Sequence, residues 1–175
     1  MAFWLLLMPQ TLYPFYSVSD DDTETGNRNL SSEKVPDRLQ AYLYYADSRS
    51  QFLKAETRLF SPAEDPVSVC RLLVEAIIDG PSGDLVATIP EGTRVLAVYI
   101  TGDKTAWIDL SREVSAGPGG IWAEVMALYS IVNTVTLNMP EVEQVKLLIE
   151  GEAAEILAGH LDIRIPYKAN MLLVR

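Results

Sequence analysis

This chain of 175 residues has little of the residue types that form covalent crosslinks and metal sites. It contains one cysteine, Cys70, and one histidine, His160. A single cysteine excludes an internal disulfide and any cysteine-rich metal site. Because Cys70 lies among apolar residues, we expect a small core side chain with a raised thiol pKa. We therefore expect a domain that is held together by its hydrophobic core, which a folded part of about 140 residues is large enough to form.

The sequence also lacks a basic surface. Its formal net charge is −10, with 24 acidic and 14 basic side chains. This balance excludes an electrostatic interface with nucleic acid and argues against binding to anionic lipid. The acidic residues are spread along the chain, which favours ordinary surface solvation over a docking site for one cationic partner.

The apolar run at the N-terminus is too short to cross a bilayer. It extends over residues 3–8 and is ended by Pro9, well short of the roughly 20 residues that a spanning helix needs. No Lys or Arg precedes it, as a secretory signal would require, and no cysteine follows at a lipoprotein position. Two interpretations of residues 1–16 stay open. The segment is either the remnant of an anchor or signal, through which the chain is tethered to a membrane, or a hydrophobic segment that packs on the domain or on a neighbouring chain.

Residues 17–36 form a second, acidic segment, whose part from 17 to 34 has two isolated aliphatic side chains and no aromatic one. Such a composition offers too little apolar surface to offset the entropy lost on ordering. We predict a flexible linker there and one folded domain over residues 37–175.

Within that domain the residue patterns predict six elements. Strands are expected over 39–45 and 52–60, and a helix with Asp65 as N-cap that ends at Gly80. A hairpin of residues 93–100 and 105–110 follows, with Gly102 taking the positive φ of its turn. A long helix after Gly117–Gly120 and a strand over 142–149 complete the set. This order predicts an α+β fold, a two-layer sandwich with two helices packed on one face of a small mixed β-sheet.

Few residues are candidates for chemistry. His160 has a carboxylate two residues away, Asp162, as a general base would need. A structural histidine that holds a loop uses the same pairing, and we favour that interpretation. The glycines of 117–120 precede a helix as in a phosphate site, but the spacing of a P-loop is missing, which favours a simple connection. We therefore predict no catalytic, cofactor-binding or metal-binding residues and no cofactor.

Two further positions carry structural expectations. Trp107 and Trp122 have no basic residues interleaved with them, so we expect both to fill the core. Asn133 lies inside a hydrophobic helix, where it must be hydrogen-bonded. We expect it to bind a neighbouring loop or strand edge, with the end of the 105–110 strand as one candidate, or to make a contact between subunits.

Several short motifs, taken in order, resemble the GerM domain family of sporulation and spore germination. They are Asp65-Pro66, Gly80-Pro81, Pro90-Glu91-Gly92-Thr93, Asp109-Leu110-Ser111, Val132-Asn133-Thr134, Pro140 with Val142, Val145–Gly151 and Gly159-His160 with Asp162. The resemblance covers about residues 38–166. It implies a fold like the ring-building motifs of secretion systems, in which helices pack side by side between subunits. It also implies a non-catalytic, extracytoplasmic domain, membrane-tethered or secreted, whose partners are envelope proteins or other copies of itself.

Two alternatives to an assembly domain remain at this stage. In the first, the loops 83–92 and 156–162 form a cleft that binds a cell-wall glycan or peptide. In the second, His160 and Asp162 belong to a hydrolase.

Overall fold

The computed structural model describes residues 38–117 and 119–175. The segments predicted as a hydrophobic N-terminus, residues 1–16, and as a linker, residues 17–36, lie outside the described residues.

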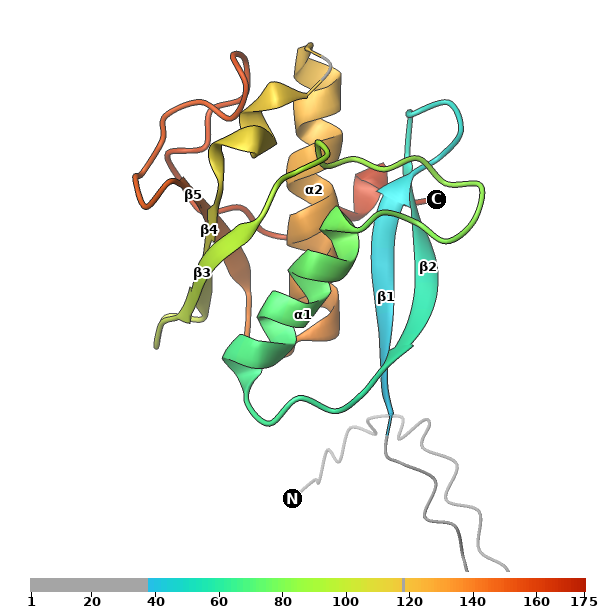
Figure 1. The fold of residues 1–175 in the computed structure, drawn as a ribbon, viewed down its shortest axis with the longest axis vertical. Coiled ribbons are helices and arrows are strands. Elements are labelled where there is room, and N and C mark those ends of the chain that lie inside the picture. Colours follow the sequence, from blue (N-terminus) through green and yellow to red (C-terminus); the bar gives the residue numbers. More distant parts are fainter. Residues whose placement is uncertain (1–37, 118) are drawn as a thin grey trace, which may run out of the picture. The chain divides into compact units, whose positions relative to one another are not determined.

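The described part contains two sheets and two α-helices (Figure 1). Strands β1 (Leu39–Ala46) and β2 (Leu53–Phe60) pair antiparallel as a hairpin. Strands β3 (Val95–Ile100), β4 (Thr105–Leu110) and β5 (Gln144–Ile149) form a mixed sheet, in which β3 and β4 are antiparallel while β4 and β5 are parallel. The α+β class is confirmed, with the addition that β1 and β2 form a sheet of their own.

The helices α1 (Pro66–Ile78) and α2 (Ile121–Asn138) pack against each other and against both sheets. Helix α1 contacts β1 and β3, and α2 contacts β1 and β5. A short 3₁₀ helix, Arg112–Ala116, precedes α2, and a second one, Met171–Leu173, lies near the C-terminus. Neither α-helix of the described residues is both long and apolar enough to span a bilayer.

Helix α1 begins and ends where its sequence predicts. The Asp65 carboxylate accepts a hydrogen bond from the Ser68 amide at 3.0 Å, and Pro66 occupies the first helical position. At the other end Gly80 has a φ of 88°, which suits glycine because it has no Cβ. Cys70 lies fully buried on the inner face, and burial raises the pKa of its thiol to about 12.

The turn between β3 and β4 differs from the prediction. The left-handed residue is Lys104, with a φ of 62°, and not Gly102. The Lys104 amide donates to the Thr101 carbonyl, and the Thr101 amide donates to the Thr105 carbonyl. The connection is therefore longer than a two-residue turn, and its last position takes the positive φ that matches the twist of the strands.

Helix α2 is buried over most of its length, as its apolar sequence predicts, and its polar side chains bind the backbone of neighbouring segments. Asn138 pairs with both backbone groups of Tyr42, and the Thr134 hydroxyl accepts from the Tyr44 amide. Asn133 accepts from the Asn170 amide at 2.9 Å and donates to its carbonyl at 3.2 Å. The expectation that Asn133 binds a loop is correct, but the loop is the C-terminal one and not the end of β4.

Candidate interaction groove at the amino end of helix α2

The amino end of α2 lies at the same end of the domain as the turn between β1 and β2 (Figure 1). Trp122, in the first turn of the helix, is 47% exposed. Its indole N–H donates to the Ser50 carbonyl at 2.7 Å, which ties the ring to the β1–β2 turn. The expectation that Trp122 fills the core is wrong, because nearly half of its surface is exposed and its indole binds a surface turn. Trp107 is half-buried.

A groove of about 300 Å³ extends beside the Trp122 ring. Its lining comes from three segments: the end of β1 and Ser50, the loop 86–90, and the first turns of α2. A wider hollow of about 640 Å³, lined by residues 49–52, shares Ser50 and Trp122 with it. Phe52 lines this hollow, and the Arg175 guanidinium lies over its ring, 4.0 Å from the ring centroid. This cation–π contact holds the Phe52 ring in place.

Apolar side chains stay exposed around this groove. Val86, which lines it, is 40% exposed, and Ile121, beside Trp122 in the sequence, is 57% exposed. Aromatic and aliphatic side chains that are left in water at a concave surface are typical of a binding site for a protein or another ligand.

The loops 83–92 and 156–162 do meet, as predicted, on the other side of Thr88 and Pro90. The cavity that they share with α2 measures about 30 Å³. This volume admits water but no sugar or amino acid, since ligand pockets have volumes of roughly 300 Å³ or more. The space that fits a ligand is therefore the groove beside Trp122 and not the cleft between the two loops.

Glu124 holds the loop 156–162 against α2. It is 4% exposed, and its carboxylate accepts hydrogen bonds from the amides of Ala158, His160 and Leu161 at 2.8 to 3.2 Å. A fourth contact joins Glu124 Oε1 to His160 Nδ1 at 2.6 Å. Burial opposes ionisation of Glu124, but the hydrogen bonds from Leu161, His160 and Ala158 outweigh it and lower its pKa to about 2.

His160 therefore has a different carboxylate partner from the one that its sequence neighbourhood predicts. Asp162 pairs with Arg164 at 2.6 Å, and this contact holds the Asp162 pKa at about 2. The structure does not join His160 to Asp162. Pairing with a buried carboxylate at a loop agrees with the structural interpretation of His160.

Gly117 and Gly119 line the small cavity together with Glu124. A carboxylate with a pKa of about 2 is ionised at neutral pH, and it repels a phosphate or other anion at that end of α2. The electrostatics therefore favour a simple connection into α2 over an anion site.

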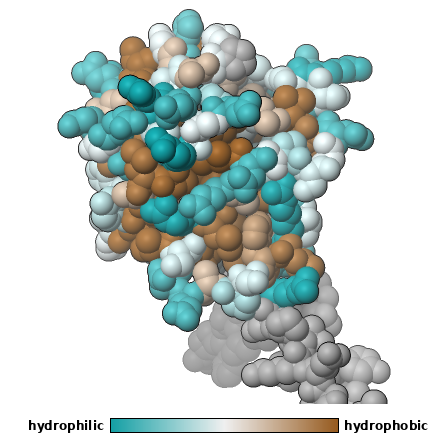
Figure 2. All heavy atoms as spheres, in the orientation of Figure 1, coloured by the Kyte–Doolittle hydropathy of each residue, from teal (hydrophilic) through white to brown (hydrophobic). Residues whose placement is uncertain are grey.

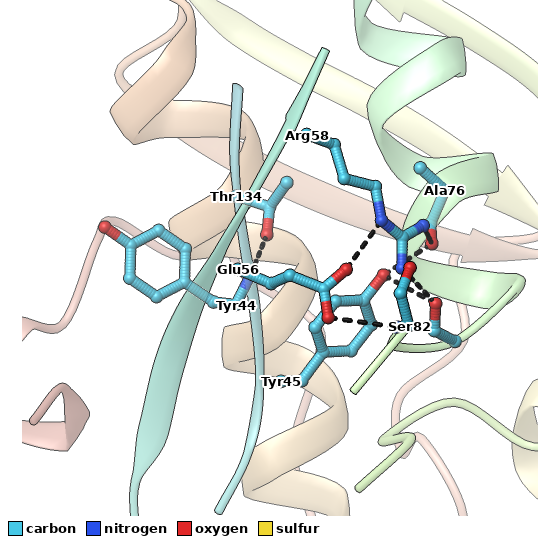
Figure 3. Close-up of polar contacts among 8 residues, drawn as sticks. Tyr44, Tyr45, Glu56, Arg58, Ala76, Ser82 and Thr134 are labelled. Atoms are coloured by element: carbon cyan, nitrogen blue, oxygen red, sulfur yellow. Dashed lines mark hydrogen bonds and ion pairs between the residues drawn. The ribbon is translucent and has the colours of Figure 1, made fainter. Parts of the chain in front are cut away.

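Away from the groove, a polar cluster ties the β1–β2 hairpin to the carboxyl end of α1 (Figure 3). Arg58 donates to the Ala76 and Gly80 carbonyls at 3.3 and 2.6 Å, and Tyr45 donates to the same two carbonyls. Glu56 accepts from Arg58 at 2.7 Å and from the Ser82 amide at 2.9 Å. A cation at a helix carboxyl end complements the unpaired carbonyls there, so this cluster stabilises the fold.

Neither the role of Glu124 in holding the loop 156–162 nor the exposure of Trp122 is predicted from the sequence. An acidic residue in the first helical turn is usually a solvated group that complements the helix dipole. The one available signal is the apolar neighbourhood of Glu124, between Trp122 and Val125, in a hydrophobic helix.

Comparisons with known proteins agree with the fold. Residues 42–155 match the family described as Germane, sporulation and spore germination. A search of the curated proteins finds no match.

Three solved structures share the fold. The first GerMN domain of the sporulation protein GerM from Bacillus subtilis has a TM-score of 0.60 and 22% identity, over 77% of this chain and 98% of that one. The tandem GerMN domains of the same protein have a TM-score of 0.59 and 23% identity, over 70% of this chain and 43% of the tandem. A candidate lipoprotein from Clostridium perfringens has a TM-score of 0.55 and 24% identity, over 75% of this chain and 87% of that one. Since the family match extends over more than half of the sequence, this chain belongs to the sporulation and spore germination family and carries a GerM-like domain.

Proposed function

We propose that this chain is a non-catalytic interaction and assembly domain of the cell envelope. The observation that carries the proposal is the groove beside Trp122, where Trp122 and Val86 remain exposed in a well-packed domain. Tryptophan is enriched among the residues that dominate binding energy in protein interfaces, because it buries a large area with few rotatable bonds. The face seen in Figure 2 carries further hydrophobic side chains at its centre, between hydrophilic ones.

The envelope location rests on similarity. The family is one of sporulation and spore germination, and one structural relative is a candidate lipoprotein. In this location the domain binds another envelope protein or a further copy of itself, and the N-terminal segment supplies the tether.

Site-specific photo-crosslinking in the native cell tests the proposal. A benzoylphenylalanine at position 122 of the full chain is expected to give discrete adducts with proteins of the envelope fraction. The same group at Tyr99, which is 58% exposed on β3, serves as the matched control. Equal labelling at both positions, or adducts only with cytosolic proteins, would contradict the proposal.

The volume of the groove favours a second candidate, a module that binds a cell-wall glycan or peptide. A space of about 300 Å³ next to an exposed indole ring, with Arg49 and Gln51 in the adjoining hollow, matches the size and polarity of a ligand pocket. Cell-wall fragments at 100 times their Kd should raise stability by about 2.7 kcal/mol. A thermal-shift series that shows no rise at millimolar fragment, or the same rise in Trp122→Ala, would exclude binding in this groove.

A further inference from the structure

Strand β2 presents an open edge to solvent. Along an antiparallel strand, the backbone groups of alternate residues point toward the partner strand. In β2 these are residues 54, 56, 58 and 60, so the backbone groups of Ala55, Thr57 and Leu59 point away from β1. None of these three has a hydrogen-bond partner among residues 38–117 and 119–175. The carbonyl of Leu53, at the start of the strand, is occupied by the Arg175 amide. The open edge is therefore the segment 55–59.

The other sheet edges are closed or distorted. The outer edge of β1 is capped by Asn138 and Thr134, and Ala46 exchanges two backbone hydrogen bonds with Val86. The outer edge of β5 pairs with Tyr167 and Glu152.

The remaining edge, that of β3, carries an irregularity between Val95 and Ala97. Arg71 donates to the carbonyls of Val95 and Leu96 there. Bulges and covering charges are the devices that keep edge strands from pairing with another chain.

The open edge of β2 carries no such device. Ala55, Thr57 and Leu59 are uncharged, they share one face of the strand, and all three are exposed, Leu59 by 57%. Proline and lysine, the residues that most often protect an edge, are absent from these outward positions. An exposed, uncharged edge of this kind is a template for one more strand.

We infer that the partner strand is β2 of a second copy, paired antiparallel about a two-fold axis at Thr57. A two-fold dimer joins identical surfaces, so like strands pair antiparallel. With Thr57 opposite Thr57, Ala55 lies opposite Leu59, and the open groups of both strands form about six hydrogen bonds. The two hairpins then form one continuous four-stranded sheet.

The charges on the other face of β2 select this register. Glu56 and Arg58 already pair within each copy. With Thr57 on the axis, each Glu56 also lies opposite the Arg58 of the other copy, so the charges of the two pairs attract each other across the axis. An axis at residue 56 places Glu56 against Glu56 and Lys54 against Arg58, and an axis at residue 58 places Arg58 against Arg58. Like charges directly opposite each other destabilise a strand pair, which disfavours the axes at 56 and 58. An axis at residue 55 would pair Lys54 with Glu56, but it places Thr57 opposite Leu53, whose carbonyl already accepts from the Arg175 amide.

This inference names a second copy as the partner in the assembly role proposed above, and it rests on that role. Its test is cysteine scanning of the full chain at positions 55, 57 and 59. Cys70 is fully buried and its thiol pKa is raised to about 12, so it does not compete for oxidation. Facing Cα atoms of a hydrogen-bonded pair lie about 5.5 Å apart, within the range that a disulfide bridges.

We expect Thr57→Cys to oxidise to a dimer at least about tenfold faster than Ala55→Cys or Leu59→Cys, because only residue 57 faces itself across the axis. Equal rates at the three positions, or a maximum at 55 or 59, would overturn the register.

A second pair of variants tests the edge itself without a crosslink. Thr57→Pro removes an outward amide but no hydrogen bond within the hairpin, and Thr57→Val keeps that amide. We expect Thr57→Pro to weaken self-association by more than about tenfold relative to Thr57→Val, with both proteins still folded. Equal self-association of the two variants would reject the β2 interface. It would still be compatible with assembly through another surface of the domain. A chain that is monomeric at every concentration would reject the dimer. Photo-crosslinking at position 122 would still test separately whether the groove binds an envelope protein.

Discussion

At the scale of single residues, buried polar side chains fix the segments that have no regular structure. The chain from residue 150 to 170 contains neither a helix nor a named strand. It is held by Glu124, by Asn133 and by Lys146, which is 3% exposed and donates its ammonium to the Ile163 carbonyl. Burial lowers the pKa of Lys146. Each of these side chains replaces the hydrogen bonds that a strand or helix would have supplied.

Glu124 should make stability depend on pH in the acid range. Its pKa is depressed in the folded state, so the stabilisation is complete above the ordinary value of 4.5 and is lost as pH falls toward about 2. The difference corresponds to about 3 kcal/mol. Urea unfolding between pH 7 and pH 2 measures it. Glu124→Gln has no charge to titrate there, so its stability should fall less steeply over this window. An equal slope in both proteins would contradict the role of Glu124.

Asn133→Ala should cost about 2 to 3 kcal/mol, because it removes two hydrogen bonds to Asn170 and leaves the part-buried backbone groups of Asn170 unpaired. Denaturant unfolding gives the value. The matched control is Asn138→Ala, whose partner Tyr42 is exposed and accessible to water. If Asn133→Ala destabilised no more than this control, the buried pair would not hold the C-terminal segment.

At the scale of elements, the polar cluster of Figure 3 predicts how the hairpin and α1 depend on each other. Arg58→Met should destabilise the protein by about 2 kcal/mol, since two carbonyls at the end of α1 lose a charged donor. Arg58→Lys keeps the charge but not the planar fork, so it should lie between wild type and Arg58→Met. Thermal unfolding ranks the three proteins. A lysine variant as unstable as the methionine variant would show that the charge at this position contributes nothing.

The elements differ in how far their sequences predict them. Helix α1 is delimited by Asp65, Pro66 and Gly80, whose roles are local and can be read from the sequence. The parallel pairing of β4 with β5 cannot be read in the same way, because it joins residues about forty positions apart and depends on the packing of α2. The same limit explains why the sequence does not identify which loop binds Asn133 and does not predict the exposure of Trp122. Both depend on hydrogen bonds to distant loops.

The candidate surfaces were less accessible to prediction than the fold. The motifs indicated an interaction domain and two loops, but the groove depends on the exposure of Trp122. The open edge of β2 depends on which edges other segments cover. Neither property is encoded in a local pattern, since each is set by tertiary contacts of residues such as Ser50, Asn138 and Arg175.

At the scale of the whole molecule, one hairpin contributes to both surfaces. Its turn, residues 49–52, lines the hollow beside Trp122, and the following segment 55–59 is the open edge. A dimer through β2 would therefore carry two grooves, one in each copy. Such an arrangement permits self-association and partner binding at the same time, which an assembly domain requires.

The central claim of assembly is tested most directly by the molar mass of the full chain in solution. Light scattering over a concentration series from micromolar to millimolar gives this mass. The account predicts a rise from one chain toward two, and a smaller rise in Thr57→Pro than in Thr57→Val at the same concentrations. A mass of one chain for the wild-type protein at every concentration would contradict it.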